Sequence, residues 1–149
     1  MTQHKETTIV YKKAVEADAA RILELLEVND GDRENFSFDQ FVVAKDDDVV
    51  IGCIRIKELV SGTLELASLV VDENYRGKGI GKKLVQEIIK QYKKRPVYLL
   101  CALENSDFYQ KSGFNIVSNE ILPADLLALY NRILKLPFAK DIKIVSMAR

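Results

Sequence analysis

The chain has 149 residues, of which 48% are hydrophobic and 30% charged, and its 22 basic residues balance its 22 acidic residues. This size and composition are typical of one globular domain, so we expect residues 1–149 to form a single domain. The sequence has no apolar run near the roughly 20 residues of a membrane span and no apolar signal-peptide core, which excludes a membrane-spanning class and favours a cytoplasmic protein.

The cysteines and the histidine argue against a metal site. Cys53 and Cys101 lie far apart in the sequence, and the single histidine is His4. Two isolated cysteines suit a reducing compartment and lack the spacing of metal ligands. We therefore expect no metal and no histidine-based catalytic triad.

The first half of the chain predicts strands around one helix. Apolar alternation predicts strands over residues 7–15, 40–45, 49–59 and 63–71. The spacing of Ile22, Leu25 and Leu26 predicts a helix that ends near residue 29, before a polar segment. The second and third strands are separated by only a short acidic turn, so they are expected to form an antiparallel hairpin.

A glycine-rich turn, Arg76-Gly77-Lys78-Gly79-Ile80-Gly81, joins the fourth strand to a helix that reaches about Lys93. Such a turn gathers backbone N–H groups at the positive end of a helix dipole, which favours a bound phosphate. The P-loop motif does not fit, because Lys83 stands where that motif needs Ser or Thr, and the dinucleotide fingerprint needs a different glycine spacing. The alternative is a plain connecting turn.

The second half adds a parallel crossover and a further pair of strands. An apolar strand over residues 97–102 is expected to be buried on both faces, and the strand–helix–strand order predicts a right-handed parallel pair. A short helix from Asn105 or Ser106 should end at Gly113. A sixth strand over residues 114–118, a helix that begins near Pro123 and a last strand over residues 141–148 follow.

Two segments together resemble the GCN5-related N-acetyltransferase (GNAT) family. The glycine-rich turn is similar to the acetyl-CoA pyrophosphate loop of this family, and a second signature is matched by Asn105, Tyr109, Lys111, Gly113 and Phe114. The resemblance implies an α/β (α+β) fold with about seven strands in a mixed, mostly antiparallel sheet and helices on both faces. In this fold the fourth and fifth strands splay apart, and the coenzyme lies in the gap.

The resemblance also implies the site residues. Those assigned to acetyl-CoA are Leu69, Val70, Val71, Arg76, Gly77, Lys78, Gly79, Ile80, Gly81, Lys82, Asn105 and Tyr109. The backbone of the fourth strand would pair with the pantetheine arm and hydrogen-bond the thioester oxygen. Asn105 would either contact that arm or cap its helix.

Two residues are candidates for proton transfer. Tyr109 is expected to protonate the leaving thiolate, and its alternative is a core tyrosine. Glu65 is the candidate general base, because the period of two puts it on one face with Ala67 and Leu69, where apolar neighbours would raise its pKa. Its alternatives are an exposed strand-end charge, or water as the base. Cys101 is expected to be simply buried rather than a nucleophile.

Charge is sorted along the chain. Residues 16–48 hold eleven acidic and three basic residues, whereas residues 76–95 hold eight basic and one acidic. The basic block surrounds the proposed phosphate loop and lacks the interleaved aromatics of RNA-binding sheets, so no nucleic-acid partner is expected. In the family the first helix and its loop roof the acceptor side, where carboxylates would attract a cationic amine. A weak resemblance of residues 122–131 to amino-acid N-acetyltransferases favours an amino acid instead.

These expectations combine into one function. The chain is expected to be an acetyl-CoA-dependent N-acetyltransferase that moves an acetyl group to a primary amine by direct attack. The alternative is a non-catalytic acetyl-CoA-binding regulatory module. The expected partners are a coenzyme A thioester and an amine acceptor, with no membrane partner, and a homodimer is left open.

Overall fold

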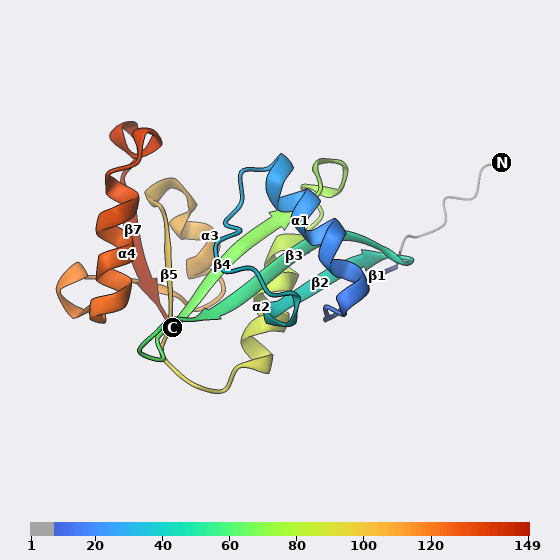
Figure 1. Cartoon of the computed structure of the whole chain (residues 1–149), viewed down its shortest axis with the longest axis horizontal. Coiled ribbons are helices and arrows are strands. Elements are labelled where there is room, and N and C mark those ends of the chain that lie inside the picture. Colours follow the sequence, from blue (N-terminus) through green and yellow to red (C-terminus); the bar gives the residue numbers. More distant parts are fainter. Residues whose placement is uncertain (1–7) are drawn as a thin grey trace. The chain divides into compact units, whose positions relative to one another are not determined.

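The computed structural model describes residues 8–149, in which seven strands form a mixed sheet of order β1-β2-β3-β4-β5-β7-β6 (Figure 1). The strands are β1 (Ile9–Lys13), β2 (Phe41–Asp46), β3 (Val49–Glu58), β4 (Leu64–Val71), β5 (Val97–Ala102), β6 (Asn115–Val117) and β7 (Ile144–Ala148). The α-helices are α1 (Ala19–Val28), α2 (Ile80–Gln91), α3 (Ser106–Gln110) and α4 (Ala124–Leu134). Each predicted element is present with ends shifted by a few residues, while Thr7 and His4 lie outside the described residues.

Strand pairing confirms the expected sheet. The pairs β1–β2, β2–β3, β5–β7 and β6–β7 are antiparallel. The pair β4–β5 is parallel and joins Leu64 to Val97 and Glu65 to Tyr98, at the start of both strands. Pairing at the strand starts leaves the other ends of these two strands unpaired with each other, as the predicted splay requires.

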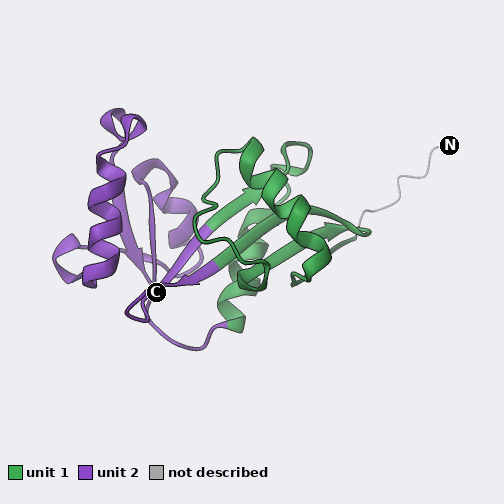
Figure 2. Ribbon diagram, in the orientation of Figure 1, with its two compact units in different colours: residues 1–55, 68–91 green, residues 56–67, 92–149 purple. Residues whose placement is uncertain are grey.

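The chain divides into two compact units (Figure 2). Unit 1 comprises the chain up to Arg55 together with residues 68–91, and unit 2 comprises residues 56–67 and 92–149. Two of the three boundaries fall inside strands, so β3 and β4 each contribute to both units, and the third boundary follows the end of α2. The expected single domain stays a prediction.

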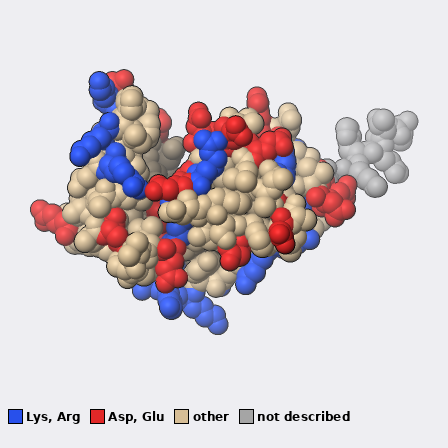
Figure 3. Space-filling view, viewed as in Figure 1, with Lys and Arg blue, Asp and Glu red and all other residues tan. Residues whose placement is uncertain are grey.

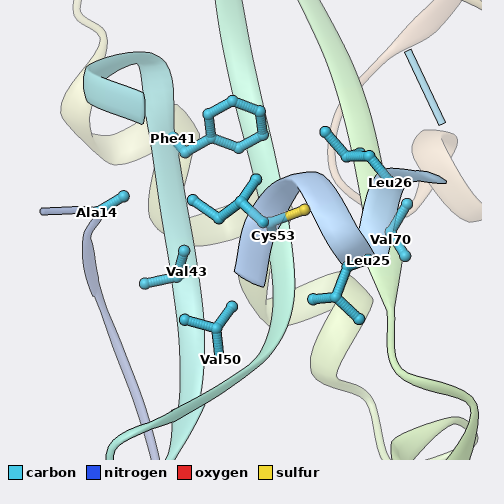
Figure 4. Packing of buried hydrophobic residues seen from close by; sticks show 9 residues of the cluster. Ala14, Leu25, Leu26, Phe41, Val43, Val50, Cys53 and Val70 are labelled. Atoms are coloured by element: carbon cyan, nitrogen blue, oxygen red, sulfur yellow. The ribbon is translucent and has the colours of Figure 1, made fainter. Parts of the chain in front are cut away.

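Helices cover both faces of the sheet in unit 1 (Figure 1). The residues Leu25 and Leu26 of α1 pack beside Phe41 and Cys53 of the adjacent strands, as Figure 4 shows. On the other face, Gly52 makes room for α2, since a Cβ there would lie 3.1 Å from Leu84 Cδ1. Burial of these apolar faces stabilises the unit and holds α2 against the sheet.

The burial of β5 in unit 2 is less complete than predicted. Val97 and Leu99 are buried, but Leu100 and Cys101 are only half-buried. Because consecutive side chains point to opposite faces, both faces of the strand are less covered toward its end. Helix α3 ends at Gln110, three residues before the predicted end at Gly113. Gly113, with a left-handed φ of 92°, instead ends the turn that follows the helix.

A buried ion pair joins Asp18 to Lys45 in unit 1. Lys45 Nζ lies 2.8 Å from Asp18 Oδ1, and the backbone N–H of Val15 donates to Asp18 Oδ2 over 2.9 Å. Burial alone would raise the pKa of Asp18, but the hydrogen bonds from Lys45 and Val15 lower that pKa overall.

We expect Asp18→Asn to lower the free energy of unfolding by about 3 kcal/mol near pH 7, because Lys45 would keep its burial without its counter-charge. The folded-state pKa of Asp18 is lowered, so its contribution is complete above the unfolded-state pKa and is lost as pH falls through the folded value. Urea unfolding should therefore show that the difference in the free energy of unfolding between the two proteins narrows below about pH 4. A difference that stays constant between pH 7 and pH 3 would contradict this account.

Candidate functional site

Strand β4 carries a backbone irregularity at Ser68. This residue has a φ of 61°, a left-handed conformation in the middle of an extended strand. Its Oγ accepts from Arg55 Nε over 2.8 Å and donates to the Asp32 carbonyl over 2.7 Å. Because a left-handed residue breaks the alternation of side chains, the prediction that Glu65, Ala67 and Leu69 share one face was wrong across this point.

The segment after β4 is braced by side chains. Asp72 accepts the backbone N–H of Asn74 over 2.9 Å and also accepts from Arg21 Nη2 of α1 over 3.0 Å. A single 3₁₀ turn, Glu73–Tyr75, follows. The Tyr75 hydroxyl donates to Asp46 at the end of β2. The turn is thereby held to two neighbouring elements of unit 1.

The cations of the glycine-rich turn have different surroundings. Arg76 Nε donates to the Val71 carbonyl over 3.1 Å, and its Nη2 donates to Asn29 Oδ1 over 2.6 Å, which ties the turn to the end of α1. Lys78 Nζ lies 5.3 Å from the ring centroid of Tyr75. Lys82 lies exposed in the first turn of α2. Arg76 therefore has a bracing role that the sequence did not indicate.

The backbone of the turn has the features of an anion seat. Gly77 and Gly79 have φ values of 78° and 79°, which residues with a Cβ adopt only under strain. Helix α2 begins directly afterwards, and its first amide N–H groups lack carbonyl partners within the helix. A Cβ on Gly77 or Gly79 would meet no atom within 4 Å. These glycines are thus needed for their backbone conformation rather than for space.

Tyr109 lies in the short helix α3 of unit 2 and packs among aromatic rings. Its ring centroid is 5.0 Å from that of Phe108 and 6.3 Å from that of Phe114, both edge to face. Burial, with a smaller contribution from the charge of Cys101, raises the pKa of Tyr109 to about 12. The phenol is therefore protonated throughout the physiological range.

The two neighbours of Tyr109 that were singled out from sequence differ in character. Burial raises the pKa of the Cys101 thiol to about 11, and its Sγ lies 3.8 Å from Met147 Sδ. A protonated thiol is a poor nucleophile, in line with the expectation that Cys101 is only packed. The exposed Asn105 precedes α3, but its side chain makes no capping hydrogen bond.

Glu65 of β4 is buried in unit 2. Its side chain is 7% exposed, and its Oε1 lies 3.8 Å from Nζ of Lys57, which is also 7% exposed. The alternative of an exposed strand-end charge was therefore wrong. The partner of Glu65 comes from the adjacent strand β3, a relation that the linear sequence does not display.

Arg55 of β3 was not among the predicted site residues, and it is fully buried. Its side chain organises the loop between α1 and β2 (residues 29–40), here called the α1–β2 loop. Arg55 also makes an ion pair with Asp32 at 3.4 Å and lies over the Phe41 ring at 5.4 Å. The available signal was one arginine within the otherwise apolar run of residues 49–56.

Residues 8–149 hold neither a metal-binding cluster nor a membrane-spanning helix. In this part of the chain, no group of three or more His, Cys, Asp or Glu side chains is arranged to hold a metal ion. Within the same residues, no helix combines the length and the apolar composition needed to cross a membrane.

Comparison with known proteins identifies the family. Residues 37–116 match the model of the acetyltransferase (GNAT) domain. An uncharacterized N-acetyltransferase of Chlorobaculum tepidum is 33% identical over 86 residues, which are 56% of this chain and 54% of that protein. The chain thus spans about half the length of this curated relative.

Solved structures share the fold at lower identity. The N-acetylglutamate synthase from Neisseria gonorrhoeae, complexed with coenzyme A and N-acetyl-glutamate, aligns with a TM-score of 0.72 and 19% identity over 95% of this chain and 35% of that chain. Rv2747 from Mycobacterium tuberculosis, in complex with CoA and NLQ, aligns with a TM-score of 0.70 and 21% identity over 93% of this chain and 97% of that chain. Since the family model covers more than half of the sequence and the strand order agrees with the expected fold, the chain belongs to the GNAT acetyltransferase family.

Proposed function

We propose that the chain is an acetyl-CoA-dependent N-acetyltransferase that transfers an acetyl group to a primary amine. The observation that carries this proposal is the pair of left-handed glycines, Gly77 and Gly79, at the start of α2 in a member of the GNAT family. The CoA complexes of the two structural neighbours support coenzyme A as the carrier. The first N–H groups of α2 would hold the pyrophosphate, with Lys78 and Lys82 as nearby cations.

The backbone of Leu69, Val70 and Val71 is proposed to pair with the pantetheine arm. The β4–β5 ladder lies at the start of both strands, and the left-handed Ser68 turns the strand just before these residues. A backbone N–H from this segment can hydrogen-bond the thioester oxygen and stabilise the charge that develops there during attack. Acetyl-CoA supplies an activated acyl carbon when it is bound. Asn105 is proposed to contact the same arm.

Tyr109 is proposed as the general acid. As the amine nitrogen bonds to the carbonyl carbon and the C–S bond breaks, the sulfur takes the hydroxyl proton of Tyr109. A phenol with a pKa of about 12 would be a weak acid toward an ordinary thiolate, whose conjugate acid has a pKa near 8.5. The Cys101 thiol shows how burial in this region affects a sulfur, because burial raises the pKa of this thiol to about 11. A leaving thiolate with similar surroundings would have a conjugate acid whose pKa lies close to that of the phenol, which eases the proton transfer.

Glu65 is proposed to remove the proton from the ammonium that forms on the attacking nitrogen, either directly or through a water molecule. Its carboxylate is buried beside Lys57, so its position is fixed by an ion pair rather than by solvent. Water acting without Glu65 is the alternative. The ion pair supports this role in one respect, since it holds the carboxylate in a fixed position, as a general base requires.

A turnover assay tests this function. Release of the coenzyme thiol from acetyl-CoA should be followed with a panel of polyamines, basic small molecules, peptide amino termini and amino acids. Thiol release that requires one class of amine is the expected result. Calorimetric binding of acetyl-CoA without turnover on any amine would favour the non-catalytic coenzyme-binding module over the enzyme. The absence of binding would overturn both.

The acceptor is proposed to be a cationic amine, with an amino acid as the alternative. Figure 3 shows Asp and Glu side chains over the face of unit 1 that carries α1 and the α1–β2 loop. Asp30 and Glu34 are exposed there, whereas Asp32 pairs with buried Arg55. Exposed carboxylates attract and steer a cationic substrate, and salt screens that attraction.

Asp30→Asn combined with Glu34→Gln is expected to lower kcat/KM for a cationic acceptor by about fivefold at low salt and to flatten its salt dependence. Asp32 is retained because of its ion pair with Arg55. Rates measured from low to high salt check this. The control is Glu58→Gln with Glu120→Gln, which removes two exposed charges from unit 2. Equal effects of the two double variants would show that net charge, rather than the loop, causes the change.

A further inference from the structure

The Arg55 guanidinium makes an unusually complete set of hydrogen bonds within unit 1. Its Nε donates to Ser68 Oγ over 2.8 Å, and Nη1 donates to Gln40 Oε1 over 3.0 Å and to the Asn35 carbonyl over 3.5 Å. Its Nη2 donates over 3.0 Å to the carbonyls of Asp32 and Glu34. A guanidinium has five N–H donors, and five acceptors surround this one.

These acceptors lie on two segments that are distant in sequence. Four of the five belong to the α1–β2 loop, and the fifth is the hydroxyl of Ser68 at the irregularity in β4. Ser68 extends the connection, because its hydroxyl also donates to the Asp32 carbonyl over 2.7 Å. The loop and the irregular point of β4 at Ser68 are therefore joined through one buried cation and one hydroxyl.

The loop has little regular structure of its own to hold its shape. Asp30 and Asn35 have left-handed φ values of 52° and 54°, a conformation that residues with a side chain adopt at a cost. Apart from the short 3₁₀ turn Phe38–Gln40, the loop has no helix or strand. Carbonyl groups that converge on a buried guanidinium can offset this cost, and the planar fork of arginine fixes their directions.

We propose that Arg55 and Ser68 are positioning residues, which hold the α1–β2 loop at a fixed place against β4 and so set how the acceptor amine meets the thioester. This inference rests on the proposed function, in which β4 aligns the thioester and the loop borders the acceptor. Neither residue touches the reacting atoms. Arg55 is fully buried, so its effect on the reaction passes through the carbonyls that it holds.

The test compares Ser68→Ala and Arg55→Lys with the wild-type protein. Ser68→Ala keeps the backbone strain and removes only the hydroxyl, whereas lysine offers three donors from one atom in place of the five-donor fork. Lys45→Met is the matched control, because Lys45 is a buried cation of the same unit that pairs with Asp18 instead of the loop. If Arg55→Lys does not fold, Ser68→Ala carries the test.

Two measurements are made on each variant. In Ser68→Ala we expect the KM for the amine to rise about tenfold while the KM for acetyl-CoA changes less than about twofold, a split that a general loss of stability would not produce. Hydrogen exchange of the amides of residues 31–40 should become about tenfold faster. Lys45→Met should raise neither KM selectively and should leave the exchange of these amides unchanged.

The outcomes separate the two proposals. Unchanged exchange in residues 31–40 of Ser68→Ala, or equal changes of both KM values, would overturn the positioning role. Failure of the wild-type protein to turn over any amine would overturn the proposed function. In that case exchange alone decides whether Arg55 and Ser68 hold the loop, because this measurement needs no activity.

Discussion

Gly79→Val is expected to weaken acetyl-CoA binding by at least about 100-fold while the protein remains folded. Gly79 has a φ of 79°, and a β-branched residue in that conformation costs on the order of 1–3 kcal/mol. The loop can escape this strain only by changing its backbone, which moves amide groups away from the phosphate. Loss of two charge-assisted hydrogen bonds would cost about 3 kcal/mol, and each 1.4 kcal/mol is tenfold in affinity.

The chain offers a matched control at Gly62. This glycine also has a left-handed φ, of 89°, and its nearest neighbour for an added Cβ is Glu58 Oε1 at 4.0 Å. It lies between β3 and β4 rather than in the proposed phosphate seat. Gly62→Val should therefore introduce similar strain and leave calorimetric binding of acetyl-CoA unchanged. Undiminished affinity in Gly79→Val, or equal losses in both variants, would overturn the assignment of the loop.

Why could the phosphate seat be predicted when other parts of the site could not? A left-handed backbone conformation costs glycine least, so the presence of glycine at positions 77 and 79 already indicates that conformation. Ser68 has nearly the same φ, yet serine is common in ordinary strands and gives no such signal. The period-two argument for Glu65 and Leu69 failed at this residue, because it assumed an uninterrupted extended strand.

The roles of charged side chains depended on partners that only the fold brings together. Arg55 stands 15 residues from Gln40 and 13 from Ser68 in the sequence, and these distances carry no recognisable period. Likewise, the sequence left Glu65 as either a general base or an exposed strand-end charge, and only the pairing of β3 with β4 places Lys57 beside it. The strands and helices themselves were predictable, since apolar periodicity reflects local geometry that each segment repeats.

Tyr109→Phe is expected to lower kcat by about 100-fold, with little change in the affinity for acetyl-CoA. The substitution keeps the ring against Phe108 and Phe114 and removes only the hydroxyl that would protonate the leaving sulfur. Single-turnover rates should be measured, because slow product release can hide an effect on the chemical step. Tyr130→Phe is the control, since Tyr130 also lies in unit 2 and its hydroxyl donates to the Ile144 carbonyl over 3.3 Å.

The pH dependence provides a second check on Tyr109. Burial raises the pKa of this phenol to about 12, so the proton-donating form persists well above neutral pH. The wild-type single-turnover rate should therefore show no loss attributable to Tyr109 up to about pH 10, where an unperturbed tyrosine would be half ionised. An unchanged single-turnover rate in Tyr109→Phe would mean that Tyr109 is only a packed aromatic residue. A wild-type rate that falls with an apparent pKa near 10 would mean that the phenol is exposed to solvent during the reaction.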